Sequence, residues 1–105
     1  MLEVTELQYF VICADVRSFS KAARVLYTTQ PNVSKVISSL EKELGRSLFE
    51  RSSRGIRITP YGEAVREYAQ NILHNVSLID SLSDHNQGKK FSLATYPSNM
   101  ISRLL

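Results

Sequence analysis

Apolar residues recur with a helical period near the start of the chain. The positions that set this period are Leu7, Phe10, Val11 and Ala14. They predict a helix from about residue 5 to residue 16 that buries one face. Ser18 then suits the N-cap of a second, shorter helix over residues 20–26, in which the adjacent Ala22 and Ala23 let another helix come close.

The pattern also predicts a third helix from residue 30 to about residue 44. Thr29 suits the N-cap, and Pro31 is tolerated because the amides of a first helical turn have no intrahelical acceptor. Gly45 suits the left-handed residue that commonly ends a helix. At about 100° per residue, one side of this helix is apolar and carries Val33, Ile37, Leu40 and Leu44. The opposite side is polar and basic, and it carries Pro31, Lys35, Ser38 and Lys42, with Ser34 at its flank.

Residues 47–59 predict a β-hairpin. The segment SLFERSSRGIRIT has apolar pairs on either side of Ser53, Arg54 and Gly55, which favour a turn. Two short strands with an arginine at the tip of their turn are therefore expected.

A long helix is predicted from Pro60 to about Ser83, because Thr59 followed by proline is typical of a helix start. At 1.5 Å per residue, about 25 residues extend over roughly 37 Å, more than the preceding elements need. Apolar residues recur along it at steps of three and four, once Asn75 is accepted at one position. They are Val65, Tyr68, Ile72, Ile79 and Leu82, with Val76 beside Asn75. This spacing predicts a seam for a second helix and hence a homodimer, since folding back over its own domain would cover only the first turns.

The composition is that of one compact domain with an appendage, with 43% hydrophobic and 22% charged residues among 105. No apolar run approaches the roughly 20 residues of a membrane span, and the opening MLEVTEL lacks the order of a signal peptide. We therefore expect a cytoplasmic protein with no membrane partner. Cys13 is the single cysteine, so it can form no internal disulfide, supplies no metal-ligand spacing, and is expected to pack as a small hydrophobe.

Charge is spread unevenly along the chain, with a net +3 over residues 1–60, −3 over residues 61–88 and +3 over residues 89–105. Residues 1–60 hold nine Lys or Arg against six Asp or Glu, whereas residues 61–88 hold one against four. Four arginines lie between Arg46 and Arg57, with Glu50 as the only acid. This distribution is compatible with an anionic partner and with a solvated basic face.

Catalytic chemistry is not indicated. His74 and His85 fall on or after the long helix, Cys13 falls in a core helix, and no predicted element assembles a nucleophile, base and acid. We expect no enzyme, no catalytic residues, no metal and no cofactor.

A short helix, a tight connection and a second helix with a polar, basic outer face form a helix-turn-helix motif. The preceding helix, the arginine-tipped hairpin and the long helix add to it. Residues 7–63, extended by the long helix to about residue 83, resemble the N-terminal part of a LysR-type transcriptional regulator. The stretches that carry the resemblance are Ser18–Ala23 (Ser-x-x-x-Ala-Ala), the cluster of Gln30, Pro31 and Ser34, LEKELG running into LFER, and TPYGE.

The resemblance implies a mainly α fold. Residues 1–59 would form a winged helix-turn-helix of three helices and a two-stranded wing, and residues 60–83 a linker helix for dimerisation. The polar residues 84–90 would be a hinge, and residues 91–105 resemble the truncated start of the family's effector-binding domain. No effector response is therefore expected of this chain, whether it is a natural fragment or a shortened form.

The resemblance also implies contacts to double-stranded DNA. Gln30, Pro31, Ser34 and Lys35 would lie in the major groove, and Arg54 in the neighbouring minor groove. Side-chain chemistry agrees, since glutamine pairs with adenine, proline meets a thymine methyl group and arginine suits a narrow minor groove. Ser18 and Thr29 are candidate phosphate contacts at helix starts, and Arg57 is a candidate sequence-independent contact.

The sequence departs from the family pattern in two ways. Asn32 and Val36 replace commoner residues at variable positions, which leaves the exact operator sequence open. Lys35 stands where arginine is frequent, so a bidentate guanine contact becomes a point-charge contact. A dimer would present two recognition helices to an interrupted inverted repeat, and a full-length form could assemble further. The alternatives are an architectural DNA binder, with equal affinity for any duplex, and a winged-helix protein-interaction module. The sequence indicates neither target genes nor operator sequence, effector, activation or repression.

Overall fold

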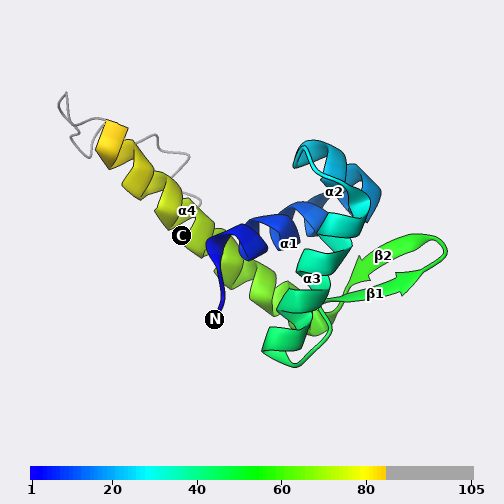
Figure 1. Cartoon of the computed structure of the whole chain (residues 1–105). Coiled ribbons are helices and arrows are strands. Elements are labelled where there is room, and N and C mark those ends of the chain that lie inside the picture. Colours follow the sequence, from blue (N-terminus) through cyan, green and yellow to red (C-terminus); the bar gives the residue numbers. More distant parts are fainter. Residues whose placement is uncertain (85–105) are drawn as a thin grey trace. The chain divides into compact units, whose positions relative to one another are not determined.

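Six helices and strands follow one another along residues 1–84, the part of the chain that the computed structural model describes. In chain order they are α1 (Val4–Val16), α2 (Phe19–Val25), α3 (Gln30–Leu44), β1 (Phe49–Ser52), β2 (Gly55–Ile58) and α4 (Pro60–Asp84) (Figure 1). The prediction of a mainly helical fold with a two-stranded wing and a long last helix is confirmed. Each predicted helix boundary lies within one residue of the observed one.

Residues 1–70 form one compact unit, and a second unit begins at Asn71, within α4. The expected hinge over residues 84–90 and the expected domain start over residues 91–105 lie outside the described residues, apart from Asp84, which ends α4. None of the helices within residues 1–84 has the length and apolar character that crossing a membrane requires.

The core of the first unit lies where α1, α2 and α3 pack together with the start of β1. Its buried residues on the three helices include Leu7, Phe10, Val11, Cys13, Ala22, Ala23, Val33, Ile37 and Leu40. Phe49 joins the hairpin to this core. Its ring centroid lies 5.4 Å from the ring centroid of Phe10 and 6.0 Å from that of Phe19. These contacts combine burial of apolar area with favourable aromatic geometry.

Two residues expected in the core are only half-buried. Ala14 lines an open cavity beneath the wing, and Leu44 occupies the last turn of α3, next to the exposed C-cap Gly45. The helical period was correct for both, but a period cannot indicate where the neighbouring elements end.

Side-chain caps fix where three of the helices begin. The hydroxyls of Ser18, Thr29 and Thr59 each accept a hydrogen bond from the backbone N–H three residues later, at 3.1, 3.3 and 2.9 Å. Gly45 ends α3 in the left-handed conformation with φ 78°. The predicted caps at Ser18 and Thr29 and the predicted helix end at Gly45 are confirmed.

The wing is a two-stranded antiparallel hairpin. Phe49 lies opposite Ile58, and Ser52 lies opposite Gly55, so that the turn consists of Ser53 and Arg54. The predicted tip is therefore confirmed.

The chain after the wing packs closely against the segment before it. The Thr59 hydroxyl donates to the Ser47 carbonyl at 2.9 Å, and the Thr59 backbone N–H donates to the Leu48 carbonyl at 2.9 Å. At Gly62 a Cβ atom would lie 2.4 Å from the Leu48 carbonyl oxygen, so only glycine fits there. An ion pair between Arg66 and Asp15 further joins the first part of α4 to α1.

Candidate nucleic-acid interface

The outer face of α3 is open to solvent in the first unit. The exposed residues along it are Gln30, Pro31, Lys35, Ser38 and Lys42, and Ser34 at its flank is half-exposed. The opposite face is buried by Val33, Ile37 and Leu40. The helix therefore presents a continuous polar and basic surface, as its sequence predicted.

The first turn of α3 is tied to its surroundings by the side chain of Asn32, whose hydrogen bonds the sequence did not indicate. The Asn32 amide nitrogen donates to the Thr28 hydroxyl at 3.0 Å and to the Tyr9 hydroxyl on α1 at 3.4 Å. No periodic signal marks this pair, because Tyr9 lies in α1 and Asn32 in α3, with α2 between them in sequence. An asparagine in the first turn of a helix is the only local indication.

Two of the candidate phosphate contacts also cap helices. Ser18 caps α2 and Thr29 caps α3, each accepting a backbone N–H. A hydroxyl that accepts in this way keeps its own proton for donation. Both can therefore serve as caps and still donate to a phosphate oxygen.

The arginines of the wing differ in what they contact. Arg57 pairs with Glu50 on the adjacent strand at 3.3 Å, and both side chains are well exposed. Arg51 pairs with Glu41 at 3.1 Å and lies over the Phe19 ring. Arg54 at the tip forms no ion pair within residues 1–84, and its backbone N–H donates to the Ser52 hydroxyl at 3.2 Å.

Several of these charged side chains line a shallow hollow of about 380 Å³ on the wing. Its lining residues include Glu50, Arg51, Arg54 and Arg57. Glu50 and Glu41 together balance two of the three guanidinium groups, so this surface keeps a net positive charge and can attract an anionic polymer. The sequence indicated the excess of arginine but not which arginines are held by carboxylates.

Glu41 connects α3 to the wing. Its Oε2 accepts the backbone N–H groups of Leu48 at 2.7 Å and Phe49 at 3.2 Å, and its Oε1 accepts from Arg51 at 3.1 Å. Because the carboxylate is 12% exposed, these charge-assisted bonds are shielded from competing water. α3 and the base of the wing are thereby held in one fixed relationship.

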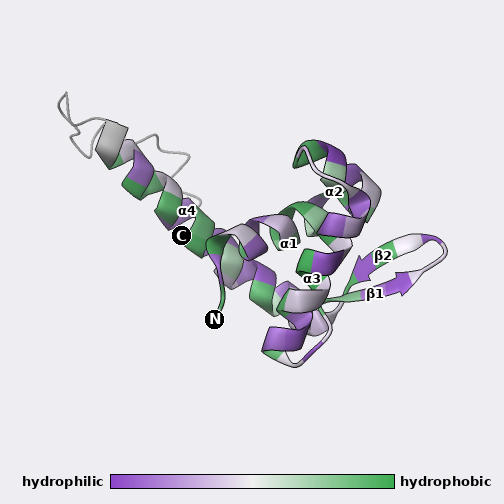
Figure 2. Cartoon of the chain, in the orientation of Figure 1, coloured by the Kyte–Doolittle hydropathy of each residue, from purple (hydrophilic) through white to green (hydrophobic). Residues whose placement is uncertain are grey.

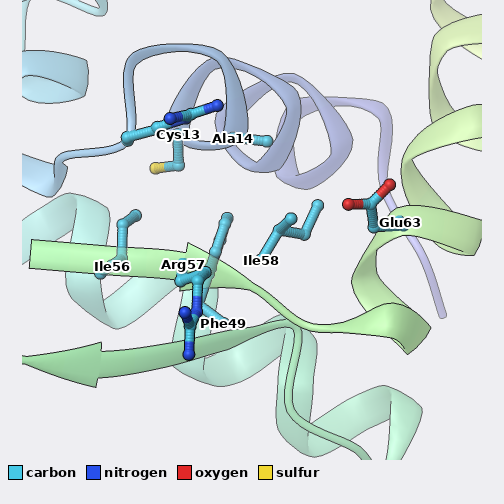
Figure 3. Close-up of a pocket in the computed structure, with 8 residues that line it drawn as sticks. Cys13, Ala14, Phe49, Ile56, Arg57, Ile58 and Glu63 are labelled. Carbon is cyan, nitrogen blue, oxygen red and sulfur yellow. The ribbon is translucent and has the colours of Figure 1, made fainter.

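A cavity of about 340 Å³ lies between α1, the wing and the first turn of α4 (Figure 3). Its lining combines apolar groups with Arg17, Arg57 and Glu63. The Cys13 sulfur points from α1 toward the hairpin in this region. Burial raises the pKa of the Cys13 thiol to about 12, although the nearby Arg51 charge acts in the opposite direction. The thiol thus stays protonated and packs as the predicted small hydrophobe.

Residues 1–84 bring no group of three or more His, Cys, Asp or Glu side chains together in a way that could hold a metal ion.

Apolar and hydrophilic residues alternate along α4 (Figure 2). Of the predicted seam residues, Tyr68, Ile72, Ile79 and Leu82 are exposed, whereas Val65 and Val76 are half-buried.

Three helices, an uncovered second helix of the helix-turn-helix and an arginine-rich wing define a winged helix-turn-helix protein. The model of the family described as bacterial regulatory helix-turn-helix proteins, lysR family, matches residues 4–63. The chain belongs to the LysR family of bacterial regulators.

Known relatives agree with this assignment. The transcriptional regulator BenM of Acinetobacter baylyi is 42% identical over 82 residues, which are 78% of this chain and 27% of BenM. The crystal structure of BenM_DBD with benA site 1 DNA has a TM-score of 0.74 at 41% identity, covering 79% of this chain and 96% of that one. Full-length CbnR complexed with its target DNA has a TM-score of 0.74 at 35% identity, covering 79% and 29%. The chain spans about a quarter of the length of the curated relatives that it matches first.

Proposed function

We propose that this chain is the DNA-binding part of a transcriptional regulator and that it recognises a specific duplex through α3. The observation that carries the proposal is the uncovered polar and basic face of that helix, from Gln30 to Lys42. An α-helix with this profile fits the major groove of B-DNA. The structures of BenM_DBD and CbnR with DNA support it by similarity.

Within this proposal, four residues of α3 enter the major groove. Gln30 pairs with the adenine edge, Pro31 meets a thymine methyl group, and Ser34 contacts a base or phosphate. Lys35 reaches guanine or phosphate as a point charge. All four lie at or beside the exposed face.

The remaining contacts go to the backbone and the minor groove. Ser18 and Thr29 donate to phosphates from two helix starts, where the backbone amides also favour anions. Arg54 enters the minor groove, which its place at the wing tip and its lack of an ion pair within residues 1–84 both favour. Arg57 contacts phosphate after exchanging its exposed pair with Glu50, at a cost of about 0 to 1 kcal/mol.

We further propose that residues 1–59 act as the DNA-binding domain and that residues 60–83 form the linker helix of a homodimer. The seam comprises Val65, Tyr68, Ile72, Val76, Ile79 and Leu82, whose spacing suits a second helix. A two-fold dimer places two copies of α3 on related half-sites, so that the operator is an interrupted inverted repeat. Such a regulator acts in the cytoplasm without catalysis of its own.

Selection of binding sites from random duplexes, at low and at moderate salt, tests this function. Recovery of one interrupted inverted repeat at both salt concentrations is the expected result. Retention of all duplexes alike, with affinity lost steeply as salt rises, would indicate an architectural binder instead. No retention at either salt concentration would favour a protein-interaction module.

A further inference from the structure

The Asn32 side chain combines two fixed hydrogen bonds with one free acceptor. Its amide nitrogen has two hydrogens, and both are engaged, one by the Thr28 hydroxyl at 3.0 Å and one by the Tyr9 hydroxyl at 3.4 Å. Within residues 1–84, its oxygen Oδ1 accepts no hydrogen bond and is not buried. The amide therefore directs its donors inward and leaves its acceptor to the solvent.

The position of Asn32 places this acceptor beside the reading surface. Asn32 lies in the first turn of α3, directly after Pro31, and it is half-exposed. It also precedes Lys35 by three residues, so the two side chains are neighbours on the helix surface. The free oxygen consequently borders the face that is proposed to enter the major groove.

Anchoring distinguishes Asn32 from the other polar residues of this turn. A free asparagine can offer its oxygen or its nitrogen and pairs with adenine through both. Here the Tyr9 hydroxyl comes from α1 and the Thr28 hydroxyl precedes α3, so the amide group is held in place by two different parts of the fold. The position of the amide is set before DNA arrives, and less side-chain freedom is lost on binding.

We propose that Asn32 is a specificity-determining residue that reads one base through its carbonyl oxygen, held in place by Tyr9 and Thr28. The oxygen accepts a hydrogen bond from adenine N6 or cytosine N4, the amino groups of the major groove. Guanine O6 and thymine O4 present acceptors there and are rejected, because two acceptors face each other without a proton. This inference rests on the proposed function of α3 in DNA recognition.

Tyr9 is accordingly a positioning residue, acting on the base through Asn32. Removing its hydroxyl leaves the α3 surface chemically unchanged but frees one amide hydrogen. The amide can then turn and offer a donor, so bases with acceptors become tolerated. A purely structural role for the hydroxyl would lower stability and affinity without changing which base is preferred.

Base preferences measured by selection from random duplexes test the inference on four proteins: the unchanged chain, Asn32→Ala, Tyr9→Phe and Tyr61→Phe. Tyr61→Phe is the matched control, because it removes a tyrosine hydroxyl from α4, away from the first turn of α3. Each half-site should contain one position where adenine or cytosine is favoured about 5- to 20-fold in the unchanged chain. Asn32→Ala should abolish this preference, Tyr9→Phe should reduce it several-fold, and Tyr61→Phe should retain it.

Several outcomes would overturn the inference. An unchanged base profile for Asn32→Ala would mean that residue 32 reads no base, and a preference for guanine or thymine at its position would mean that the amide faces the other way. Equal profiles for Tyr9→Phe and Tyr61→Phe would remove the positioning role. In all three cases an inverted repeat would still be recovered and the proposed function would stand, whereas failure to recover any repeat with the unchanged chain would reject both.

Discussion

The carboxylate of Glu41 on α3 accepts the backbone N–H of Leu48 at 2.7 Å, just before the first strand of the wing. The same group binds the Phe49 N–H and the Arg51 guanidinium. Two backbone donors and one cation thus depend on a single side chain. The angle between α3 and the wing therefore depends on this carboxylate as well as on the core.

Replacing Glu41 should test this dependence. Glu41→Ala leaves two partly buried amides and Arg51 without their acceptor, so the free energy of unfolding should fall by about 1 to 3 kcal/mol in urea titrations. Glu50→Ala is the matched control, because it removes a glutamate from an exposed pair and should change stability by no more than about 1 kcal/mol. Equal effects of the two substitutions would contradict the proposed role of Glu41 in fixing the wing to α3.

Base contacts and phosphate contacts should respond differently to substitution. Ser34→Ala or Gln30→Ala should cost about 1 to 3 kcal/mol on the selected operator and relax the sequence preference. Arg57→Ala should weaken all duplexes similarly and reduce the salt dependence of binding. Titrating each variant against operator and scrambled duplexes at several salt concentrations separates base contacts from phosphate contacts. If Ser34→Ala and Arg57→Ala gave the same binding profiles, the assignment of these two kinds of contact would be wrong.

The seam on α4 makes a prediction about assembly. Ile79 is 62% exposed in the single chain, and a glutamate in its place should be tolerated by the monomer but not within an apolar helix pair. Ile79→Glu should therefore sediment as a monomer at concentrations where the unchanged chain is a dimer. Ser77→Glu, also on α4 but outside the seam, should remain dimeric. A dimer that persists in Ile79→Glu would reject the seam.

Cys13 should make stability depend on pH in the alkaline range. Its pKa rises on folding from 9.0 to about 12 because burial disfavours the thiolate. The stabilisation from the protonated thiol is therefore complete below about pH 9 and is lost as the pH rises toward 12, by about 1.4 kcal/mol per pH unit. Cys13→Ala should show a shallower decline between pH 9 and 11 in chemical unfolding. Parallel curves for the two proteins would contradict the buried, protonated thiol.

Local chemistry explains why so much of the fold could be predicted from the sequence. Ser18, Thr29 and Gly45 act within a few residues of their own position, so their residue types alone indicate where α2 and α3 begin or end. The stripe through Val33, Ile37 and Leu40 is equally local. Helix boundaries and buried faces followed from these signals.

The candidate site could be predicted only in part, because its organisation depends on pairs distant in sequence. Asn32 meets Tyr9 across 23 positions, and Arg51 meets Glu41 across 10. No period or cap signals such a pair. The exposed face of α3 was therefore predictable, whereas the distinction between held and free arginines in the wing required the three-dimensional arrangement.

The described bonds that secure the hairpin gather at its root, at Leu48, Phe49 and Thr59, while Ser53 and Arg54 form the turn. Because these bonds lie at the root, substitutions at the tip leave them intact. Under the proposed function, exchange of the tip residues between relatives would change the minor-groove preference and leave the scaffold intact. Operator preference would then diverge fastest among relatives at the wing tip, the part of the hairpin with the fewest structural contacts.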